Sequence, residues 1–177
     1  MSEAEKVRAE ISDTLNEDAA AVRRAVFMDE QGFENEFDET DGISKHIVLY
    51  DGDIPAAVCR VYTAADGCGH IGRIAVIKPY RGKGLGNRIL SEAEKLIANM
   101  GMETSVLSAQ ERASGFYTAN GYEKFGDIYY DEYCPHIKMK KKNQLIAAAL
   151  SVALMGSLAG VTAFAANNNN QQSDTAD

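Results

Sequence analysis

Cysteine is scarce in this sequence. Only three cysteines occur among the 177 residues, Cys59, Cys68 and Cys134. Because their number is odd and no two of them are spaced as C-x-x-C, the sequence excludes a disulfide-stabilised scaffold and a cysteine-based metal or redox motif. We therefore expect three reduced thiols in a cytoplasmic domain that binds no metal.

Positive charge is also in short supply. The chain has 18 lysines and arginines against 26 aspartates and glutamates, which gives a net charge of −8 at pH 7. This balance argues against a general affinity for nucleic acid, whose phosphates an acidic protein repels. An acidic protein is better suited to a cationic substrate.

The chain is too short for two domains of typical size, and it carries no internal repeat. A length of 177 residues suits one sizeable core, and a content of 45% hydrophobic and 25% charged residues is typical of a globular protein. Near residue 140 the composition changes to lysines, an uncharged apolar stretch and a polar tail. We expect a domain at 1–140, an apolar segment at 141–166 and a disordered polar tail at 167–177.

The domain combines strand and helix patterns in an α/β (α+β) order. Alternating apolar residues between turn signals predict strands, and apolar residues at helical spacing predict helices. The expected strands are 5–11, 46–50, 54–64, 69–77, 103–109, 122–130 and 135–140, and the expected helices are 16–28, 85–100 and 113–120. The strands meander first, and a strand-loop-helix-strand crossover follows in the middle of the chain.

The apolar segment leaves several interpretations open. Leu145 to Ala166 is uncharged, about long enough to span a bilayer, and preceded by lysines, as expected of a tail anchor with a cytoplasmic flank. Read from Met139, the same stretch has the basic start, apolar middle and Ala-Phe-Ala end of a bacterial secretory signal at the wrong end of a chain. A fused or misjoined reading frame would explain this, and an Ala-rich helix packed on the domain is a third alternative.

The most informative stretch is KPYRGKGLGNRIL, residues 78–90. Gly82, Gly84 and Gly86 alternate through a loop, and apolar residues then recur at helical spacing from Leu85 to a stop at Gly101. A glycine loop that opens a helix offers free backbone N–H groups and the positive end of the helix dipole, which together bind anions. Basic side chains at positions 81, 83 and 88 add donors suited to phosphate oxygens. The stretch therefore predicts a pyrophosphate site.

The spacing of the glycines decides which pyrophosphate ligand is expected. A nucleotide P-loop requires Gly-Lys-Ser/Thr, which does not occur, and the dinucleotide pattern G-x-G-x-x-G fails at its last position. The pattern that fits is Arg-x-x-Gly-x-Gly, at Arg81, Gly84 and Gly86, directly after an apolar strand.

In this motif the sequence resembles the GNAT superfamily of acyl-CoA-dependent N-acetyltransferases, whose coenzyme A loop carries (Arg/Gln)-x-x-Gly-x-(Gly/Ala). Downstream, QERASGFYTANGYEKFG is similar to a second family segment, with Ala113, Tyr117, Gly121 and Tyr122 in register. RRAVFMDEQGFENEFDETD and CPHIKM are similar to a bacterial branch of small, stand-alone members. The resemblance covers roughly residues 6–140.

The resemblance implies a mixed, mostly antiparallel central sheet flanked by helices, with a splayed strand pair at the acyl-CoA site. It also implies the residues that bind acetyl-CoA, by backbone groups on the strand before the loop, by the loop itself and by a side chain on the next strand. These are Ile74, Ala75, Val76, Arg81, Gly82, Lys83, Gly84, Leu85, Gly86, Asn87 and Gln110. Gln110 stands where the family often has Asn, and its amide can still hydrogen-bond the pantetheine arm.

The resemblance further implies that Tyr117 protonates the departing thiolate. The proton on the acceptor amine is the harder problem, because an alkylamine with a pKa of about 10.4 must lose it at pH 7, at a cost of roughly 4.6 kcal/mol. The candidate bases are Glu30, Glu34, Asp38 and His136, of which we rank Glu30 and His136 first. The acidic stretch from 34 to 41 looks first like a solvated loop, which could also attract a cationic acceptor.

The resemblance thus implies an N-acetyltransferase that moves an acetyl group from acetyl-CoA, its co-substrate, to a primary amine by direct transfer in a ternary complex. The acceptor is a small molecule, a peptide or a protein. A non-catalytic acyl-CoA-binding sensor on the same fold is the alternative, because fold and cofactor loop alone do not establish turnover. The sequence leaves open a homodimer and membrane contact through Leu145 to Ala166.

Overall fold

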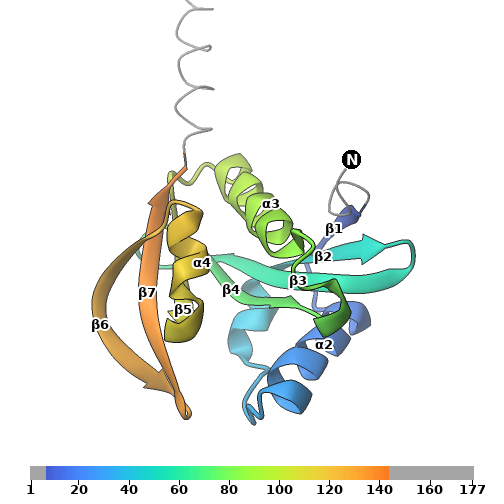
Figure 1. Cartoon of the computed structure of the whole chain (residues 1–177). Coiled ribbons are helices and arrows are strands. Elements are labelled where there is room, and N and C mark those ends of the chain that lie inside the picture. The colour runs from blue at the N-terminus through green and yellow to red at the C-terminus, as the bar shows by residue number, and fades with distance from the viewer. Residues whose placement is uncertain (1–6, 144–177) are drawn as a thin grey trace, which may run out of the picture. The chain divides into compact units, whose positions relative to one another are not determined.

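The computed structural model describes residues 7–143, which form one seven-stranded sheet with its helices (Figure 1). The elements are β1 (Arg8–Ser12), α2 (Glu17–Arg23), the π-helix η1 (Arg24–Glu30), the 3-10 helix η2 (Glu39–Ile43), β2 (Lys45–Asp51), β3 (Ile54–Thr63), β4 (Gly69–Val76), η3 (Lys78–Tyr80), α3 (Leu85–Asn99), β5 (Thr104–Gln110), η4 (Glu111–Ala113), α4 (Ser114–Ala119), β6 (Glu123–Asp131) and β7 (Cys134–Lys142). No helix within this described range is both long and apolar enough to cross a membrane. The apolar segment from Leu145 to Ala166 and the polar tail lie outside the described residues.

The sheet is mixed and mostly antiparallel, which confirms the expected fold class. Its strand order is β1-β2-β3-β4-β5-β7-β6, and all neighbouring strands pair antiparallel except β4 and β5. The glycine loop and α3 connect this parallel pair, as the crossover pattern predicts. Every expected strand and helix is present, although the first helix continues as a π-helix to Glu30 and β7 runs past residue 140 to Lys142.

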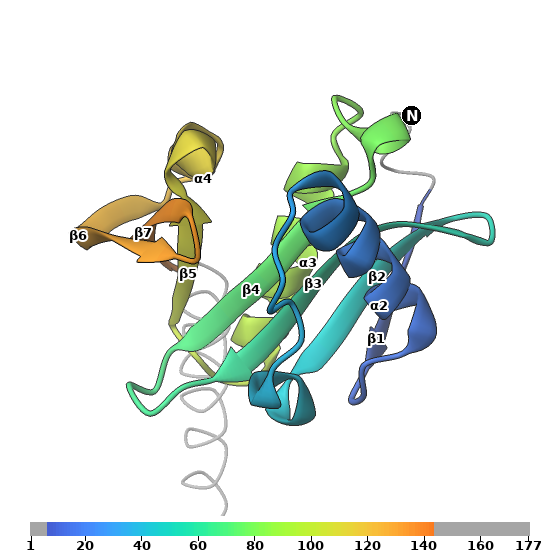
Figure 2. The same ribbon diagram turned by 90° about the horizontal axis from the view of Figure 1, so that it is seen from below.

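Both faces of the sheet are covered by hydrophobic clusters. On one face, α3 packs against Ile47 and Leu49 of β2. On the other face, α2 and η1 pack against Val48 and Tyr50 of the same strand. Successive residues of a strand point to opposite faces, so β2 is buried on both sides. Figure 2 shows α2 and α3 on opposite sides of the sheet.

The parallel pair β4 and β5 separates after a short ladder. Only three residue pairs join these strands, and the last of them is Ile71 with Leu107. Figure 2 shows the two strands diverging. On the other side of β4, the pairing with β3 is irregular between Val58 and Arg60, and Arg73 lies in this irregular stretch with a φ angle of 54°. A bulge bends a strand and turns it away from its neighbour, so the bulge at Arg73 accompanies the splay.

A buried ionic cluster ties the loop between η1 and β2 to the rest of the domain. It consists of Arg23, Glu36, Asp38, Asp41, Arg60 and Arg73. Arg23 of α2 is fully buried and donates to the carboxylate of Glu36 at 2.7 Å and to that of Asp41 at 2.6 Å. This pairing fixes the loop to α2.

Two further arginines fix the same loop to the sheet. Arg60 of β3 donates to Asp38 at 2.6 Å and to Asp41 at 2.9 Å, and Arg73 of β4 donates to Asp38 at 3.1 Å. Burial alone would raise the pKa of Asp41, but the hydrogen bonds from its two arginines outweigh burial and lower this pKa. The hydrogen bond from Arg60 likewise lowers the pKa of Asp38.

The expectation of a solvated acidic loop is therefore wrong for Glu36 and Asp41. Glu36 and Asp41 are buried, and Asp38 has both carboxylate oxygens bound by arginines. Three guanidinium groups balance three carboxylates, so the cluster as a whole carries no net charge. These acids cannot attract a cationic acceptor, because their charge is already compensated within the protein.

The cluster makes Arg23 the most sensitive arginine of the domain. Arg23→Ala removes the fully buried arginine that binds both Glu36 and Asp41 and leaves each carboxylate with one arginine instead of two, and we expect it to lower the free energy of unfolding by about 3–5 kcal/mol. The neighbouring Arg24→Ala removes an exposed ion pair with Glu17 and a contact with the ring of Phe37, and should cost about 1 kcal/mol. Urea unfolding of both variants measures the difference, and equal losses would contradict the role assigned to the cluster.

Candidate active site

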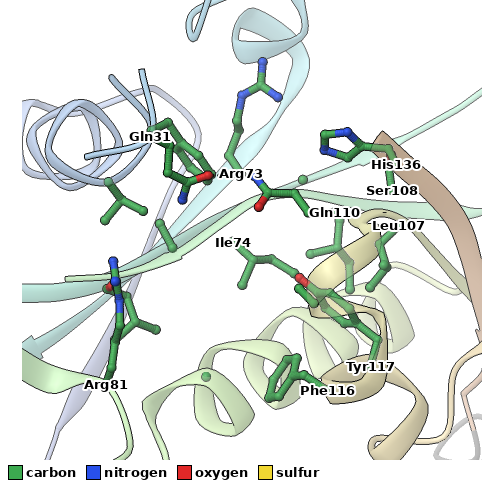
Figure 3. A pocket seen from close by; sticks show the side chains of 18 residues that line it. Gln31, Arg73, Ile74, Arg81, Leu107, Ser108, Gln110, Phe116, Tyr117 and His136 are labelled. Atoms are coloured by element: carbon green, nitrogen blue, oxygen red, sulfur yellow. Dashed lines mark hydrogen bonds between the residues drawn. The ribbon is translucent and has the colours of Figure 1, made fainter. Parts of the chain in front are cut away.

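A cleft of about 390 Å³ opens where β4 and β5 separate. The side chains labelled in Figure 3 come from its walls and are Gln31, Arg73, Ile74, Arg81, Leu107, Ser108, Gln110, Phe116, Tyr117 and His136. Phe116 and Tyr117 project from α4 on one side of the cleft, and His136 projects from β7 on the other (Figure 3). Arg81 lies at the end away from His136 (Figure 3). We call this cavity the splay cleft.

The splay cleft brings together part of the residue set that the resemblance implies for the coenzyme. Those that line it are Ile74, Ala75, Val76, Arg81, Gly86 and Gln110. Gly82, Lys83, Gly84, Leu85 and Asn87 are not among the lining residues and lie in the loop and the first turn of α3. The side chain of Leu85 is in the hydrophobic core, so only its backbone can serve a ligand.

The edge of β4 offers backbone groups to the splay cleft. The amide of Ile77 donates to the carbonyl of Ala56 in β3 at 3.0 Å, so the backbone N–H of Ile77 points toward β3. Neighbouring residues of an antiparallel strand turn their backbone groups to opposite sides, so Val76 faces the gap while Ala75 faces β3. Ile74 belongs to the bulge and is outside the regular ladder. Ile74 and Val76 are therefore better placed than Ala75 to bind a ligand through their backbone.

The N-terminus of α3 has the geometry of an anion site. Gly82 and Gly84 have φ angles of 75° and 86°, a region that glycine enters without strain. Gly84 is the N-cap, no side chain caps the helix, and no acidic residue lies in the first turn. The first N–H groups of this 15-residue helix are therefore left for an anion. Gly86 serves packing, because a Cβ there would meet the ring of Phe116 at 3.4 Å.

Arg81 forms an exposed ion pair with Glu30. The guanidinium donates to the two oxygens of this carboxylate at 2.6 and 2.7 Å, and its Nε donates to the carbonyl of Val76 at 2.9 Å. The hydrogen bond from Arg81 lowers the pKa of Glu30, so Glu30 is ionised throughout the neutral range. Glu30 does not line the splay cleft, and the structure does not bring it together with Tyr117 and His136 there.

Gln110 joins the two sides of the splay cleft. Its amide donates to the side-chain oxygen of Gln31 at 2.8 Å, and its own oxygen accepts from Arg112 at 2.9 Å. Arg112 also donates to Gln31 at 3.0 Å, and the hydroxyl of Tyr133 donates to the backbone carbonyl of Gln31. Gln31, at the end of η1, is thus tied to β5 and to the β6–β7 turn across the cleft.

Tyr117 presents a phenol to the splay cleft. Its ring is largely buried and makes edge contacts with Phe116 and Tyr122 at centroid distances of 5.0 and 6.1 Å. Burial raises the pKa of Tyr117, so the phenol keeps its proton at any neutral or mildly alkaline pH. Its hydroxyl makes no hydrogen bond to the other residues between 7 and 143, which leaves the proton available for a ligand.

His136 presents a ring nitrogen that can accept a proton. Its Nδ1 lies 3.0 Å from the carbonyl oxygen of Cys134. Because a carbonyl can only accept, Nδ1 carries the hydrogen and Nε2 of the neutral ring has a lone pair. The ring is buried and stacks on Tyr129 at a centroid distance of 5.9 Å, which fixes its orientation.

A second cavity of about 340 Å³ adjoins the splay cleft, and we call it the side pocket. It is lined by residues of β3, β4, β5, β6 and β7. The residues common to both cavities are Ile71, Gly72, Arg73, Leu107, Ser108 and His136. The two cavities therefore meet where β4 and β5 part, and His136 lies at their junction.

Gln31, Arg73 and Ser108 line the splay cleft although the sequence analysis did not single them out. For Arg73 a signal existed, because a charged residue interrupts the apolar strand GHIGRIAVI. Gln31 and Ser108 stand in no motif, and only the folded arrangement places them.

The arrangement combines a proton donor, a proton acceptor and two connected cavities. Tyr117 can donate to an atom in the splay cleft, while His136 can accept a proton at the junction with the side pocket. Free backbone groups along β4 and the N-terminus of α3 can hold an extended ligand with an anionic end. Such a site suits group transfer between two molecules that enter from different sides.

The sequence matches the family model for the acetyltransferase (GNAT) domain over residues 11–143. The uncharacterized N-acetyltransferase YjcF of Bacillus subtilis is 39% identical over 127 residues, which cover 70% of this chain and 90% of YjcF. A crystal structure from Lactobacillus plantarum, assigned as an N-acetyltransferase, has a TM-score of 0.72 and 29% identity, covering 77% of this chain and 98% of that chain.

A Bacillus subtilis acetyltransferase solved in complex with CoA shares the fold, with a TM-score of 0.62 and 15% identity over 77% of this chain and 99% of that chain. The family match spans most of the sheet, the glycine loop and the catalytic candidates Glu30, Tyr117 and His136. The chain therefore belongs to the GNAT acetyltransferase family and is an acyltransferase.

Proposed function

We propose that this acyltransferase moves an acetyl group from acetyl-CoA to a primary amine by direct attack in a ternary complex. The observation that carries the proposal is the meeting of two cavities at the splay of β4 and β5, with Tyr117 on one side and His136 at the junction. In this proposal acetyl-CoA occupies the splay cleft, and the amine enters through the side pocket.

The splay cleft and the adjoining N-terminus of α3 together suit acetyl-CoA along its whole length. The pyrophosphate would bind the uncapped N-terminus of α3 and the turn at Gly82 and Gly84. The pantetheine arm would pair with the backbone groups of Ile74 and with the backbone N–H of Val76, whose carbonyl already accepts from Arg81, as a further strand does at an open sheet edge. A thioester oxygen held by such a backbone N–H gains negative charge in the transition state, and the N–H stabilises it there. The solved relative with bound CoA supports this choice of co-substrate.

Amine attack forms a nitrogen–carbon bond and breaks the carbon–sulfur bond through a tetrahedral intermediate. The ammonium form has no lone pair, and His136 Nε2 is the group we assign to take its proton. Glu30 is the weaker candidate, since both of its oxygens already bind Arg81. Asp38 is engaged in the same way by Arg60.

The departing thiolate is stabilised by Tyr117. A thiolate with a pKa of about 8.5 is less basic than a phenolate, so the phenol helps mainly by donating a hydrogen bond to sulfur. Burial keeps Tyr117 protonated and thus keeps it a donor. A non-catalytic sensor would need neither this donor nor a base. Measurable turnover therefore distinguishes an acetyltransferase from an acyl-CoA sensor.

The coenzyme site makes Gly84 critical. Gly84→Val places a branched side chain at a residue with a φ angle of 86° and blocks the first N–H groups of α3. Losing two charge-assisted hydrogen bonds at about 1.5–3 kcal/mol each should raise the dissociation constant of acetyl-CoA roughly a hundredfold or more. Isothermal titration calorimetry measures this constant.

The matched control is Gly101→Val, at the opposite end of α3 with a φ angle of 83°. It introduces a similar backbone strain and should leave acetyl-CoA binding close to wild type. If both variants bind acetyl-CoA equally well, the coenzyme does not use the N-terminus of α3.

The phenol of Tyr117 is tested by Tyr117→Phe. Removing one hydrogen bond to a charged sulfur should lower kcat roughly ten- to a hundredfold, with little change in KM for acetyl-CoA. Steady-state release of CoA is the measurement, and Tyr122→Phe, a buried tyrosine outside the splay cleft, is the control. Equal kcat values for Tyr117→Phe and wild type would remove Tyr117 from the chemistry.

The assignment of the base is tested by comparing His136→Gln with Glu30→Gln. Loss of a general base should lower kcat/KM for the amine about 10²–10⁴-fold in His136→Gln, and the deficit should shrink as pH rises toward the amine pKa of about 10.4. Glu30→Gln should cost less than about tenfold, because Glu30 holds Arg81 and not the amine. The reverse order in the pH–rate profiles would make Glu30 the base.

A further inference from the structure

The side pocket carries a cation that the domain leaves uncompensated. Its wall contains three other basic side chains with carboxylate partners, which are Arg60 with Asp38 and Asp41, Arg73 with Glu36 and Asp38, and His70 with Asp66. Lys138 also lines the pocket, is exposed, and has neither an ion-pair partner nor a hydrogen-bond partner within residues 7–143. It is thus the basic group of this wall that remains available for a ligand.

Lys138 lies next to the catalytic candidate His136. The two residues are separated by one position on β7, so their side chains point to the same face of the sheet, with Cα atoms about 6.5–7 Å apart. Ser108 of β5 pairs with Lys138 across the strands, and its hydroxyl is hydrogen-bonded to that of Tyr129. A ligand held at Lys138 would therefore extend along β7 to the imidazole.

The proposed binding of acetyl-CoA does not account for Lys138. Arg81, directly before the glycine loop, lies at the other end of the splay cleft from His136 (Figure 3). The pyrophosphate would bind there, and Lys138 does not line the splay cleft at all. Lys138 is therefore accessible to a molecule that enters through the side pocket and not to one in the splay cleft.

The opposite charge is also present in the side pocket. Asp131 at the end of β6 lines the same wall and has no ion-pair partner among the described residues. One free carboxylate and one free ammonium group match a ligand that carries both charges. In a chain with a net charge of −8, a localised cation is what gives an anionic group a favourable place to bind.

We propose that the acceptor is a small amine that also carries an anionic group, a carboxylate or a phosphate, and that Lys138 binds this group while the amine faces His136. The inference rests on the proposed amine acetylation. A cavity of about 340 Å³ suits a small molecule, so the anion and the amine belong to one compact acceptor. Lys138 is then a specificity-determining residue.

The experiment compares acceptors of matched length at saturating acetyl-CoA. 4-Aminobutanoate carries a carboxylate, 2-aminoethyl phosphate carries a phosphate, butylamine is uncharged beyond its amine, and 1,4-diaminobutane carries a second cation. CoA release gives kcat/KM for each. We expect at least one anionic acceptor to exceed butylamine by about tenfold or more, since one charge-assisted hydrogen bond contributes that much. The ratio of kcat/KM for 4-aminobutanoate to that for 2-aminoethyl phosphate shows which of the two anions the pocket prefers.

Lys138→Gln should remove this preference by raising KM for the anionic acceptor, and Lys138→Glu should shift the preference toward the diamine. Because Lys138 is exposed, neither substitution threatens the fold. Lys95→Gln, an exposed lysine of α3 paired with Glu92, is the matched control and should retain the wild-type preference. An unchanged preference in Lys138→Gln, or a wild-type preference for butylamine or the diamine, would overturn the inference.

Failure of the underlying reaction is recognised separately, by calorimetric binding of the same amines to the complex of the protein with CoA. If no amine is acetylated but an anionic amine binds in a Lys138-dependent manner, the ligand class stands and the acetylation does not. If butylamine is acetylated and no anionic amine binds through Lys138, the acetylation stands and the ligand class is overturned.

Discussion

The early end of the ladder between β4 and β5 is the constraint on which the rest of this structure depends. The strands share only three residue pairs, and beyond Ile71 and Leu107 each leaves an edge without a neighbour. Backbone groups on such an edge must find partners or remain in contact with solvent. The splay cleft, the side pocket and the position of His136 between them all follow from this separation. A closed sheet of the same strands would have no place for two substrates.

The splay persists because other contacts hold the two halves of the sheet in place. The ionic cluster fixes the loop after η1 to α2, β3 and β4. Its positive and negative charges are paired, and their attraction offsets the free-energy cost of removing them from water. Arg73 joins this cluster from the bulge itself, at a φ angle that is costly for a residue with a Cβ. Across the gap, Gln31 is bound to Gln110, Arg112 and Tyr133. The cleft is thus framed by polar contacts between segments that are distant in the sequence.

Much of the fold was readable from the sequence, because local signals specify it. Alternation, the Asp-Gly turn and the helical spacing after Gly84 predicted the elements, and the GNAT resemblance predicted their sheet. The side chains that pair across the fold were not readable. Nothing local shows that Glu36 is buried against Arg23, or that Glu30 holds Arg81. The glycine loop before α3 was predictable since it is one contiguous motif, whereas the side pocket is assembled from five strands and carries no motif.

The central claim is that the open edge of β4 binds the acyl donor. Amide hydrogen exchange of Ile74 and Val76, followed by NMR with and without acetyl-CoA, tests it most directly. The account predicts that acetyl-CoA slows exchange at these two amides, while the amides of β2, already paired on both sides, do not respond. Binding of acetyl-CoA without any protection of Ile74 and Val76 would contradict the account, because the coenzyme would then lie elsewhere on the molecule.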